Sequence, residues 1–352
     1  MPGPTLSEVA RDAGVSLATA SRAINGSANR TVRPDLRERV LASARRLGYS
    51  PDPSAQAMAR GRTTSVGLVV HDIADPYFSS LAAGVAEAAD RDGLIVTLTS
   101  TRHSPERERA FVELMDRQRA RAVVLGGGRL TEDADGALRG ALERYRASGG
   151  GVSLVGQPLG DLPAVEIANA DGAADLARAL HGLGYRAFGV LAGPAGHRTA
   201  LDRARGFTGA LADLGSPVPP DAVVECAFTR DGGHGGMREL LDRLGSGPLG
   251  TGTPPVAVFA VNDVMAVGAM AAAREAGLRV PEDVAVAGFD DIVTLRDVTP
   301  GLTTVRIPLA EVGEQALALA LAPSPALTDD AAAPQRVVVR GEAVIRESTP
   351  PL

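Results

Sequence analysis

The chain has 352 residues, 45% hydrophobic and 22% charged, which is typical of a soluble globular protein with room for two or three domains. A single cysteine, Cys226, excludes an internal disulfide, and the absence of a signal peptide or membrane-length apolar run predicts a cytoplasmic protein. The net charge is −6, yet residues 1–62 contain ten arginines and five acids, so a basic segment precedes a body of charge −11. This asymmetry favours nucleic-acid contact near the N-terminus.

Residues 5–25 predict two short helices joined by a tight turn. Thr5 and Glu8 form a capping-box pattern that begins the first helix at Leu6, Gly14 permits the turn, and Ser16 is a good N-cap for the second helix. The outer face of that helix carries short side chains and one arginine: Leu17, Ala18, Thr19, Ser21 and Arg22, with Asn25 at its end. Such a face suits entry into the DNA major groove. The segment therefore predicts a helix-turn-helix, although an ordinary αα-hairpin in a globular core would share this pattern.

A third helix is expected over residues 34–47, ended by Gly48, which makes residues 1–48 a three-helix headpiece. Residues 49–62 predict a linker with helix-forming residues at 54–60. So short a helix is marginal in water and forms only when something orders it. A plain flexible linker is the alternative.

Residues 63–352 alternate short apolar strands with helices of about 10–15 residues, the pattern of parallel βαβ units. This α/β pattern predicts two doubly wound parallel-sheet lobes. The first lobe is expected to comprise residues 63–165 and 302–322, including a late strand at 302–305 and a helix at 310–322. The second is expected to comprise residues 166–298 and 334–352, including short strands at 337–339 and 343–345.

Enzyme motifs are missing or stand in the wrong context. Residues 245–250 match G-x-G-x-x-G by letters, but they follow a predicted helix and precede a strand, the reverse of the nucleotide-binding arrangement. No P-loop, H-E-x-x-H or G-x-S-x-G motif occurs, and the five histidines lack metal-ligand spacing. We expect no enzyme activity, no metal and no cofactor.

The segment TLSEVARDAGVSLATASRAIN, residues 5–25, resembles the headpiece of the LacI/GalR family of bacterial transcription regulators. The body resembles the family's effector-binding core, itself similar to periplasmic sugar-binding proteins, at residues 75–78, 191–194, 203–207, 262–263, 288–291 and 346–349. The resemblance implies a periplasmic-binding-protein-like core of two lobes joined by three crossovers, with ligand in the cleft. It also implies that the linker is a hinge helix, paired across a dimer in the minor groove, where Met58 holds the position of an apolar wedge.

The resemblance implies a ligand-responsive transcriptional repressor that binds an inverted-repeat operator in double-stranded DNA as a homodimer, without a membrane partner. Two headpieces are needed because one recognition helix reads only a few base pairs. We expect Leu17 and Ala18 to make apolar contacts and Arg22 to reach a guanine or a phosphate. The remaining expected DNA contacts are Thr5, Ser16, Thr19, Ser21, Asn25, Tyr49 and Met58.

The expected effector residues combine aromatic, amide and carboxylate groups that suit a polyhydroxylated ligand: Asp75, Tyr77, Phe78, His197, Leu201, Phe228, Asn262 and Asp290. Leu201 stands where sugar-binding relatives place an arginine, Ile307 where glutamine is common, and Gly126 and Gly156 where polar contacts are common. We therefore expect a carbohydrate-derived effector that is larger or less polar than a simple monosaccharide. Alternatively, Leu201 and Ile307 merely pack, and Arg198 or His197 supplies the missing donor.

A second function stays open at the level of the sequence. The core could be a small-molecule binding module or a sugar-processing enzyme, whose N-terminal helices serve only to form a dimer. Fluorescence anisotropy with duplex DNA at several salt concentrations separates this function from that of a regulator, because only the regulator binds DNA specifically.

Overall fold

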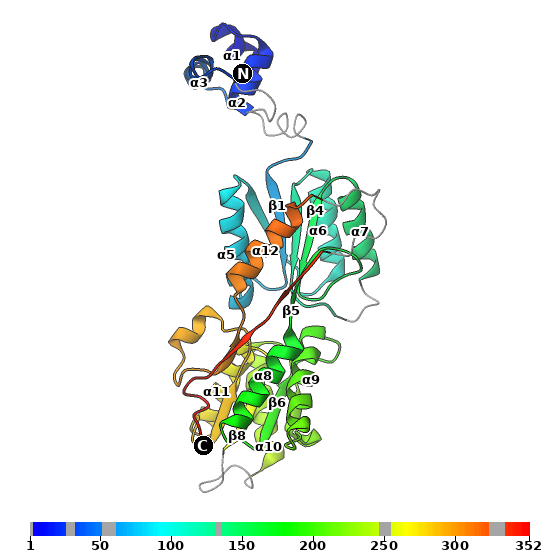
Figure 1. Ribbon diagram of the computed structural model, residues 1–352, viewed down its shortest axis with the longest axis vertical. Helices are drawn as coiled ribbons and strands as arrows, with labels where there is room; N and C mark the ends of the chain where they lie inside the picture. The colour runs from blue at the N-terminus through cyan, green and yellow to red at the C-terminus, as the bar shows by residue number, and fades with distance from the viewer. Residues whose placement is uncertain (1–2, 26–31, 51–60, 131–134, 246–254, 324–334) are drawn as a thin grey trace. The chain divides into compact units, whose positions relative to one another are not determined.

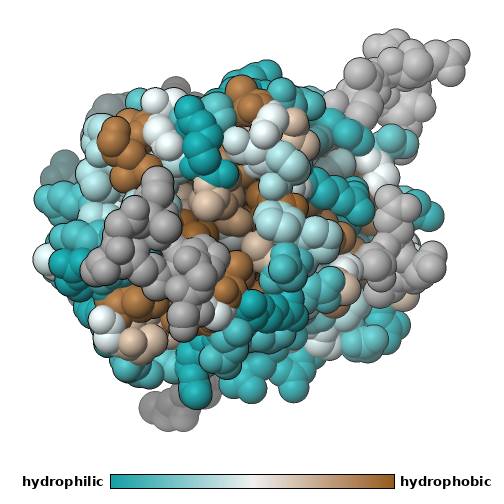
Figure 2. Space-filling model, turned by 90° about the horizontal axis from the view of Figure 1, so that it is seen from below, coloured by the Kyte–Doolittle hydropathy of each residue, from teal (hydrophilic) through white to brown (hydrophobic). Residues whose placement is uncertain are grey.

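The computed structural model describes residues 3–25, 32–50, 61–130, 135–245, 255–323 and 335–352 (Figure 1). The chain divides into two compact units, Met1–Thr64 and Ser65–Leu352. No helix among the described ranges is long and apolar enough to cross a membrane. The face of the molecule in Figure 2 is largely hydrophilic, with hydrophobic residues in separate groups.

The described part of the first unit contains three helices, α1 (Leu6–Asp12), α2 (Leu17–Asn25) and α3 (Pro34–Leu47), whose starts agree with the predicted ones. The capping box is confirmed, because the backbone N–H of Glu8 donates to the Thr5 hydroxyl and that of Thr5 donates to the Glu8 carboxylate. Gly14 and Gly48 adopt φ of +63° and +66°, conformations that favour glycine. A small core holds the helices together: Val9, Ala10, Ala13, Ala20, Ala23, Val40 and Ala44.

The first lobe of the larger unit is a six-stranded parallel sheet in the order β11-β5-β4-β3-β1-β2. Its strands are β1 (Ser65–Val70), β2 (Ile95–Ser100), β3 (Ala122–Gly126), β4 (Gly151–Val155), β5 (Ala164–Ile167) and β11 (Arg336–Val339). Helices cover both faces: α6 (Pro105–Arg117) and α7 (Gly136–Ala147) pack on one, α5 (Pro76–Arg91) and α12 (Leu309–Leu321) on the other (Figure 1). This is the doubly wound arrangement that the sequence predicts.

The second lobe is a four-stranded parallel sheet in the order β7-β6-β8-β9. Its strands are β6 (Phe188–Ala192), β7 (Val223–Glu225), β8 (Val256–Ala260) and β9 (Val284–Ala287). Its helices are α8 (Asn169–Gly182), α9 (Arg198–Asp213), α10 (Arg230–Leu244) and α11 (Asp263–Glu275), with short 3-10 helices η2 (Pro220–Ala222) and η3 (Val293–Asp297). Helices α8 and α9 pack together, as do α10 and α11.

Two late strands lie in the lobe opposite to the expected one. The strand expected in the first lobe at 302–305 is β10 (Thr304–Arg306), which pairs with β12 (Glu342–Val344). Isolated bridges from Thr303 to Ala287 and from Arg306 to Asp290 join this segment to the second lobe. The strand expected in the second lobe at 337–339 is β11, which extends the first sheet beside β5. Pairing between parallel strands joins residues far apart in sequence, so local patterns do not assign a strand to a lobe. Three crossovers join the lobes, at residues 168, 307–308 and 340–341.

Candidate nucleic-acid interface and ligand pocket

The first turn of α2 presents an apolar surface to solvent. Ser16, Leu17 and Ala18 are exposed, and Leu17 keeps 52% of its surface accessible. The N-terminal turn of α2 is fixed by the Ser16 hydroxyl, which accepts a hydrogen bond from the backbone N–H of Thr19 at 3.2 Å. Thr19, Ser21, Arg22 and Asn25 are half-buried along the same helix. An exposed leucine at a capped helix start can reach base edges that a buried one cannot.

Contacts from α3 hold the turn before α2. The Arg39 guanidinium donates to the Ala13 carbonyl at 2.6 Å, and a Cβ on Gly14 would lie 3.1 Å from that guanidinium. Ser43 and Arg46 both donate to the Asp12 carboxylate, and the Ser43 hydrogen bond lowers the pKa of that carboxyl. The angle between α1 and α2 is therefore set by contacts from α3 as well as by the turn itself.

The other expected DNA contacts have different surroundings. The Thr5 side chain belongs to the capping box of α1. Tyr49 packs against the small core of the headpiece. Asn25 donates to the Ser21 hydroxyl at 3.3 Å. Met58 and the rest of the expected hinge helix at 54–60 lie outside the described residues.

The larger unit contains a cavity of about 510 Å³ between its lobes. The cavity is lined by all but one of the expected effector residues: Asp75, Tyr77, Phe78, His197, Phe228, Asn262 and Asp290. Three of them are N-caps, Asp75 of α5, His197 of α9 and Asn262 of α11, so three helix N-termini meet at this site. Ligands of parallel α/β sheets bind at this edge, where strands end and helices begin.

A buried ion pair, Arg203 with Asp290, lines the cavity. The guanidinium donates to the carboxylate oxygens at 2.7 and 3.2 Å, to Asn169 Oδ1 at 2.8 Å and to the Val261 carbonyl at 2.9 Å. It also lies over the Phe289 ring, 3.8 Å from the centroid. Burial raises the pKa of Asp290 to about 6, although Arg203 acts in the opposite direction.

The expectation that a guanidinium is lost at Leu201 is wrong. Leu201 does not line the cavity, whereas Thr199 and Arg203 both do. Residues four apart share one face of a helix, and residues two apart do not, so Leu201 points away from the ligand side. The i,i+4 spacing of Thr199 and Arg203 is the signal that would have identified this arginine.

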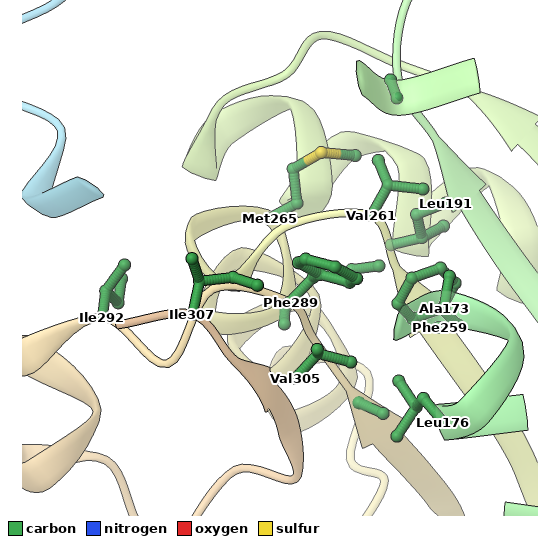
Figure 3. Packing of buried hydrophobic residues seen from close by; sticks show 14 of the residues in the cluster. Ala173, Leu176, Leu191, Phe259, Val261, Met265, Phe289, Ile292, Val305 and Ile307 are labelled. Atoms are coloured by element: carbon green, nitrogen blue, oxygen red, sulfur yellow. The ribbon is translucent and has the colours of Figure 1, made fainter. Parts of the chain in front are cut away.

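Two further expectations are corrected. Ile307 is 3% exposed and packs in the core near Phe289 and Val305 (Figure 3), and it is not among the residues that line the cavity. Gly126 does not line the cavity either, and a Cβ there would lie 2.6 Å from the Leu81 side chain. Gly156 does line the cavity, as expected. Ile307 therefore packs, as the alternative interpretation held.

Two histidines missed by the sequence analysis, His71 and His103, line the cavity from the first lobe. His71 Nε2 is 3.4 Å from Glu108 Oε1, and the other oxygen of Glu108 accepts from Arg129 at 2.6 Å. Burial lowers the pKa of these two histidines and of His197, which also lines the cavity. The pKa of His103 falls to about 3 and that of His197 to about 4, and the pKa of His71 is lowered as well. All three are uncharged at neutral pH. Each of the two missed histidines stands just after a strand, β1 or β2, and that position is the available signal.

The described part of the chain contains no group of three or more histidine, cysteine or acidic side chains that could hold a metal ion. The polar groups of the cavity are instead held by hydrogen bonds within the protein, as Asn262 is by the Met265 N–H at 2.8 Å. The arrangement is that of a binding pocket with preorganised polar groups.

Both units of the chain match known protein families. Residues 5–52 match the family described as "Bacterial regulatory proteins, lacI family", and residues 177–349 match a "Periplasmic binding protein-like domain". The HTH-type transcriptional repressor CytR of Escherichia coli (strain K12) is 33% identical over 318 residues, 90% of this chain and 89% of that protein. The HTH-type transcriptional regulator DegA of Bacillus subtilis (strain 168) is 29% identical, covering 99% of this chain and 98% of its own. These names are those of transcriptional regulators rather than enzymes.

A solved structure, the transcriptional regulator CelR–cellobiose complex, is 32% identical with a TM-score of 0.68, covering 98% of this chain and 99% of its own. The lac repressor dimer bound to operator and the anti-inducer ONPF has a TM-score of 0.78, covers 99% of each chain and is 24% identical, so it supports the fold alone. Both likenesses extend over the headpiece and the core.

Proposed function

Since this chain belongs to the lacI family of bacterial regulatory proteins and is a ligand-responsive DNA-binding transcriptional regulator, we propose that it is a repressor of an inverted-repeat operator. The observation that carries the proposal is the exposed first turn of α2, with Leu17 and Ala18 outward on a helix that is rigidly capped. Leu17 and Ala18 contact base edges such as thymine methyl groups, and Arg22 contacts a guanine or a phosphate.

The other polar residues of the headpiece position it on the DNA backbone. Ser16 and Thr19 are hydrogen-bonded to each other, as are Ser21 and Asn25, which favours phosphate contacts over base readout. Thr5 at the start of α1 and Tyr49 after α3 are also among the residues proposed to contact phosphates. Phosphate contacts of this kind fix the register of the recognition helix without reading sequence.

Exposed apolar residues on an edge strand support a homodimer. Strand β2 ends the six-stranded sheet, and its Ile95 and Leu98 are 67% and 37% exposed. A long apolar sheet edge promotes association unless something covers it. A second copy of the chain, placed against β2, would cover this edge and bring two headpieces to the two halves of an operator.

The effector occupies the cavity between the lobes and changes DNA affinity by changing lobe closure. The linker then transmits the change, because a short helix at residues 54–60 is stable only when its surroundings order it. Met58 is the proposed minor-groove wedge of that helix.

The proposed effector is carbohydrate-derived and larger than a simple monosaccharide. Asp290, Arg203 and Asn262 all line the cavity and can hydrogen-bond hydroxyl groups. The cavity of about 510 Å³ is about seventeen times the roughly 30 Å³ that one water occupies in the liquid, so a single sugar ring leaves much of it unfilled. The disaccharide in the CelR complex is a precedent for a larger ligand.

Selection of binding sites from random duplexes, followed by fluorescence anisotropy at several salt concentrations, tests the DNA-binding proposal. We expect an inverted repeat, and we expect Arg22→Ala to cost about 1–3 kcal/mol at one base position if Arg22 reads a base. Arg45→Ala, on the exposed face of α3, is the matched control and should leave sequence preference unchanged. A protein that binds no duplex specifically would instead be a ligand-binding module or enzyme that uses its headpiece only to dimerise.

A further inference from the structure

The first-lobe sheet has a second edge that the ligand pocket does not use. Strands β1 to β4 run parallel, so the helices before β2, β3 and β4 all end at the edge where these strands begin. We call it the amino edge. The first-lobe residues that line the cavity, such as His71, His103 and Gly128, come after strands and therefore lie at the other edge.

The amino edge of the first lobe is basic. From the last four residues of α5, α6 and α7 to the following strand, the chain contains six arginines and three acids, a balance of +3, within residues 88–94, 114–121 and 144–150. Residues 63–352 as a whole carry −11, so this edge has the opposite sign to the body on which it lies.

The same edge of the second lobe is not basic. From the last four residues of α8, α9, α10 and α11 to the following strand, the chain contains four arginines and six acids, within residues 179–187, 210–222, 241–255 and 272–283. Basic residues are favoured at the C-terminus of any helix by its dipole. That effect acts on both lobes alike, so it does not explain why only the lobe that the linker enters has a basic edge.

The charge of the basic edge is concentrated in one loop. Arg91 pairs with Glu314 at 3.0 Å, and Arg144 lies 4.0 Å from Glu113. Residues 117–121, with the sequence RQRAR, contain three arginines and no acid, and all three arginine side chains are exposed. We call this segment the arginine loop.

The arginine loop lies beside the point where the linker enters the core. Strand β1 begins at Ser65, and the backbone N–H of Arg121 donates to the Ser65 carbonyl at 2.7 Å. The buried Tyr145 hydroxyl donates to the Ala120 carbonyl at 2.6 Å, which fixes the backbone of the loop from the other side. Three guanidinium groups are therefore held next to the chain that leads to the headpiece.

We propose that the arginine loop binds DNA phosphates while the headpiece reads the operator. Guanidinium groups match phosphate oxygens in charge and geometry, and a phosphate contact needs no particular base. The loop thereby offsets the repulsion between DNA and an acidic body that the linker keeps near it. This inference rests on the proposed function, because it adds a second contact with the same DNA.

The salt dependence of operator affinity tests the proposal, because each phosphate contact steepens the slope of log affinity against log salt by about 0.9. The full chain is titrated by anisotropy with the selected operator and with an unrelated duplex, at several salt concentrations. Arg117→Gln, Arg119→Gln and Arg121→Gln in one chain should make the slope shallower by about 2–5, which corresponds to one to three lost contacts in each protomer of a dimer. Both duplexes should lose affinity by a similar factor, since phosphates carry no sequence.

The matched control removes the same charge from the second lobe. Arg205→Gln, Arg238→Gln and Arg274→Gln replace exposed arginines on α9, α10 and α11 and should leave the slope unchanged. If the arginine-loop variant folds poorly in circular dichroism, the double variant that retains Arg119 takes its place and should make the slope shallower by about 2–4.

Three results would overturn the proposal: an unchanged slope in the arginine-loop variants, an equal change in the control, or a loss confined to the operator. The first two would show that the loop does not contact DNA or that only net charge matters, and the third would indicate base reading. A wild-type chain that binds no duplex specifically refutes the proposed function as well. Specific operator binding with an unchanged slope refutes only this inference.

Discussion

Replacing Arg203 with methionine is expected to destabilise the Ser65–Leu352 unit by about 3–5 kcal/mol near pH 8. The variant removes both hydrogen bonds to Asp290, at 2.7 and 3.2 Å, and leaves that carboxylate buried without a counter-charge. It also removes the hydrogen bonds to Asn169 and the Val261 carbonyl. Methionine fills much of the vacated volume against Phe289, so the lost charge compensation, not a cavity, dominates the cost.

The loss should depend on pH in a defined direction. The folded-state pKa of Asp290 is already raised to about 6, above its ordinary value of 3.8, and removing Arg203 raises it further. Between the unfolded and folded pKa values the folded state binds more protons, so stability falls as pH rises through this window. In the variant the window extends to higher pH. The destabilisation should therefore be small near pH 5, where Asp290 takes up a proton, and full near pH 8.

Urea unfolding followed by circular dichroism, near pH 5 and near pH 8, measures both effects. The double variant Arg203→Met, Asp290→Asn is the control, because it removes the uncompensated charge and should recover much of the loss near pH 8. Equal destabilisation at both pH values, with no recovery in the double variant, would refute the reasoning.

Four other substitutions test separate features. Gly128→Ala should cost about 1–3 kcal/mol in urea unfolding, because its Cβ would lie 2.5 Å from Thr199 Oγ1 of the second lobe. Gly14→Ala should destabilise the headpiece by about 1–2 kcal/mol, measured by thermal melting, because φ there is +63°. Leu98→Arg should convert the proposed dimer to a monomer in sedimentation. Met58→Gly should weaken operator binding in anisotropy while leaving core folding and effector binding intact.

Each of these four predictions has an outcome that would contradict it. Gly209→Ala, where a Cβ meets nothing within 4 Å, is the control for the glycine variants and should not destabilise. A Gly128 or Gly14 variant as stable as this control would show that the backbone relaxes. An unchanged mass for Leu98→Arg would place the dimer contact elsewhere, and unchanged operator affinity for Met58→Gly would remove the wedge role.

The headpiece and the ends of most helices could be predicted because their signals are local. Thr5 with Glu8, Gly14 and Gly48 act through backbone groups within a few residues, so their effect is visible in a short stretch of sequence. The same holds for Asp75 and Asn262, which cap helices directly after strands. Their place at the edge of a parallel sheet follows from the alternation of strands and helices.

The lobe assignment of β10 and β11 could not be predicted in this way. Strand β11 is four residues long and joins the first lobe only because β5 offers it an edge, and β5 was not expected from the sequence. The sequence analysis expected Ile307 to line the pocket for a related reason. Ile307 lies at a crossover between the lobes, where the local direction of the backbone determines whether a side chain points into the core or into the cavity.

By itself the amino-acid sequence determined the class of the protein: a capped helix-turn-helix before two parallel α/β lobes, with polar residues where strands end. Only the tertiary structure decided which arginine places its guanidinium in the pocket and which side chains lie beside it. Arg203 meets Asp290, and His71 meets His103, across separations in the chain that no local pattern spans. Periodicity specifies the face of an element, but the partner of that face is set by packing between elements distant in sequence.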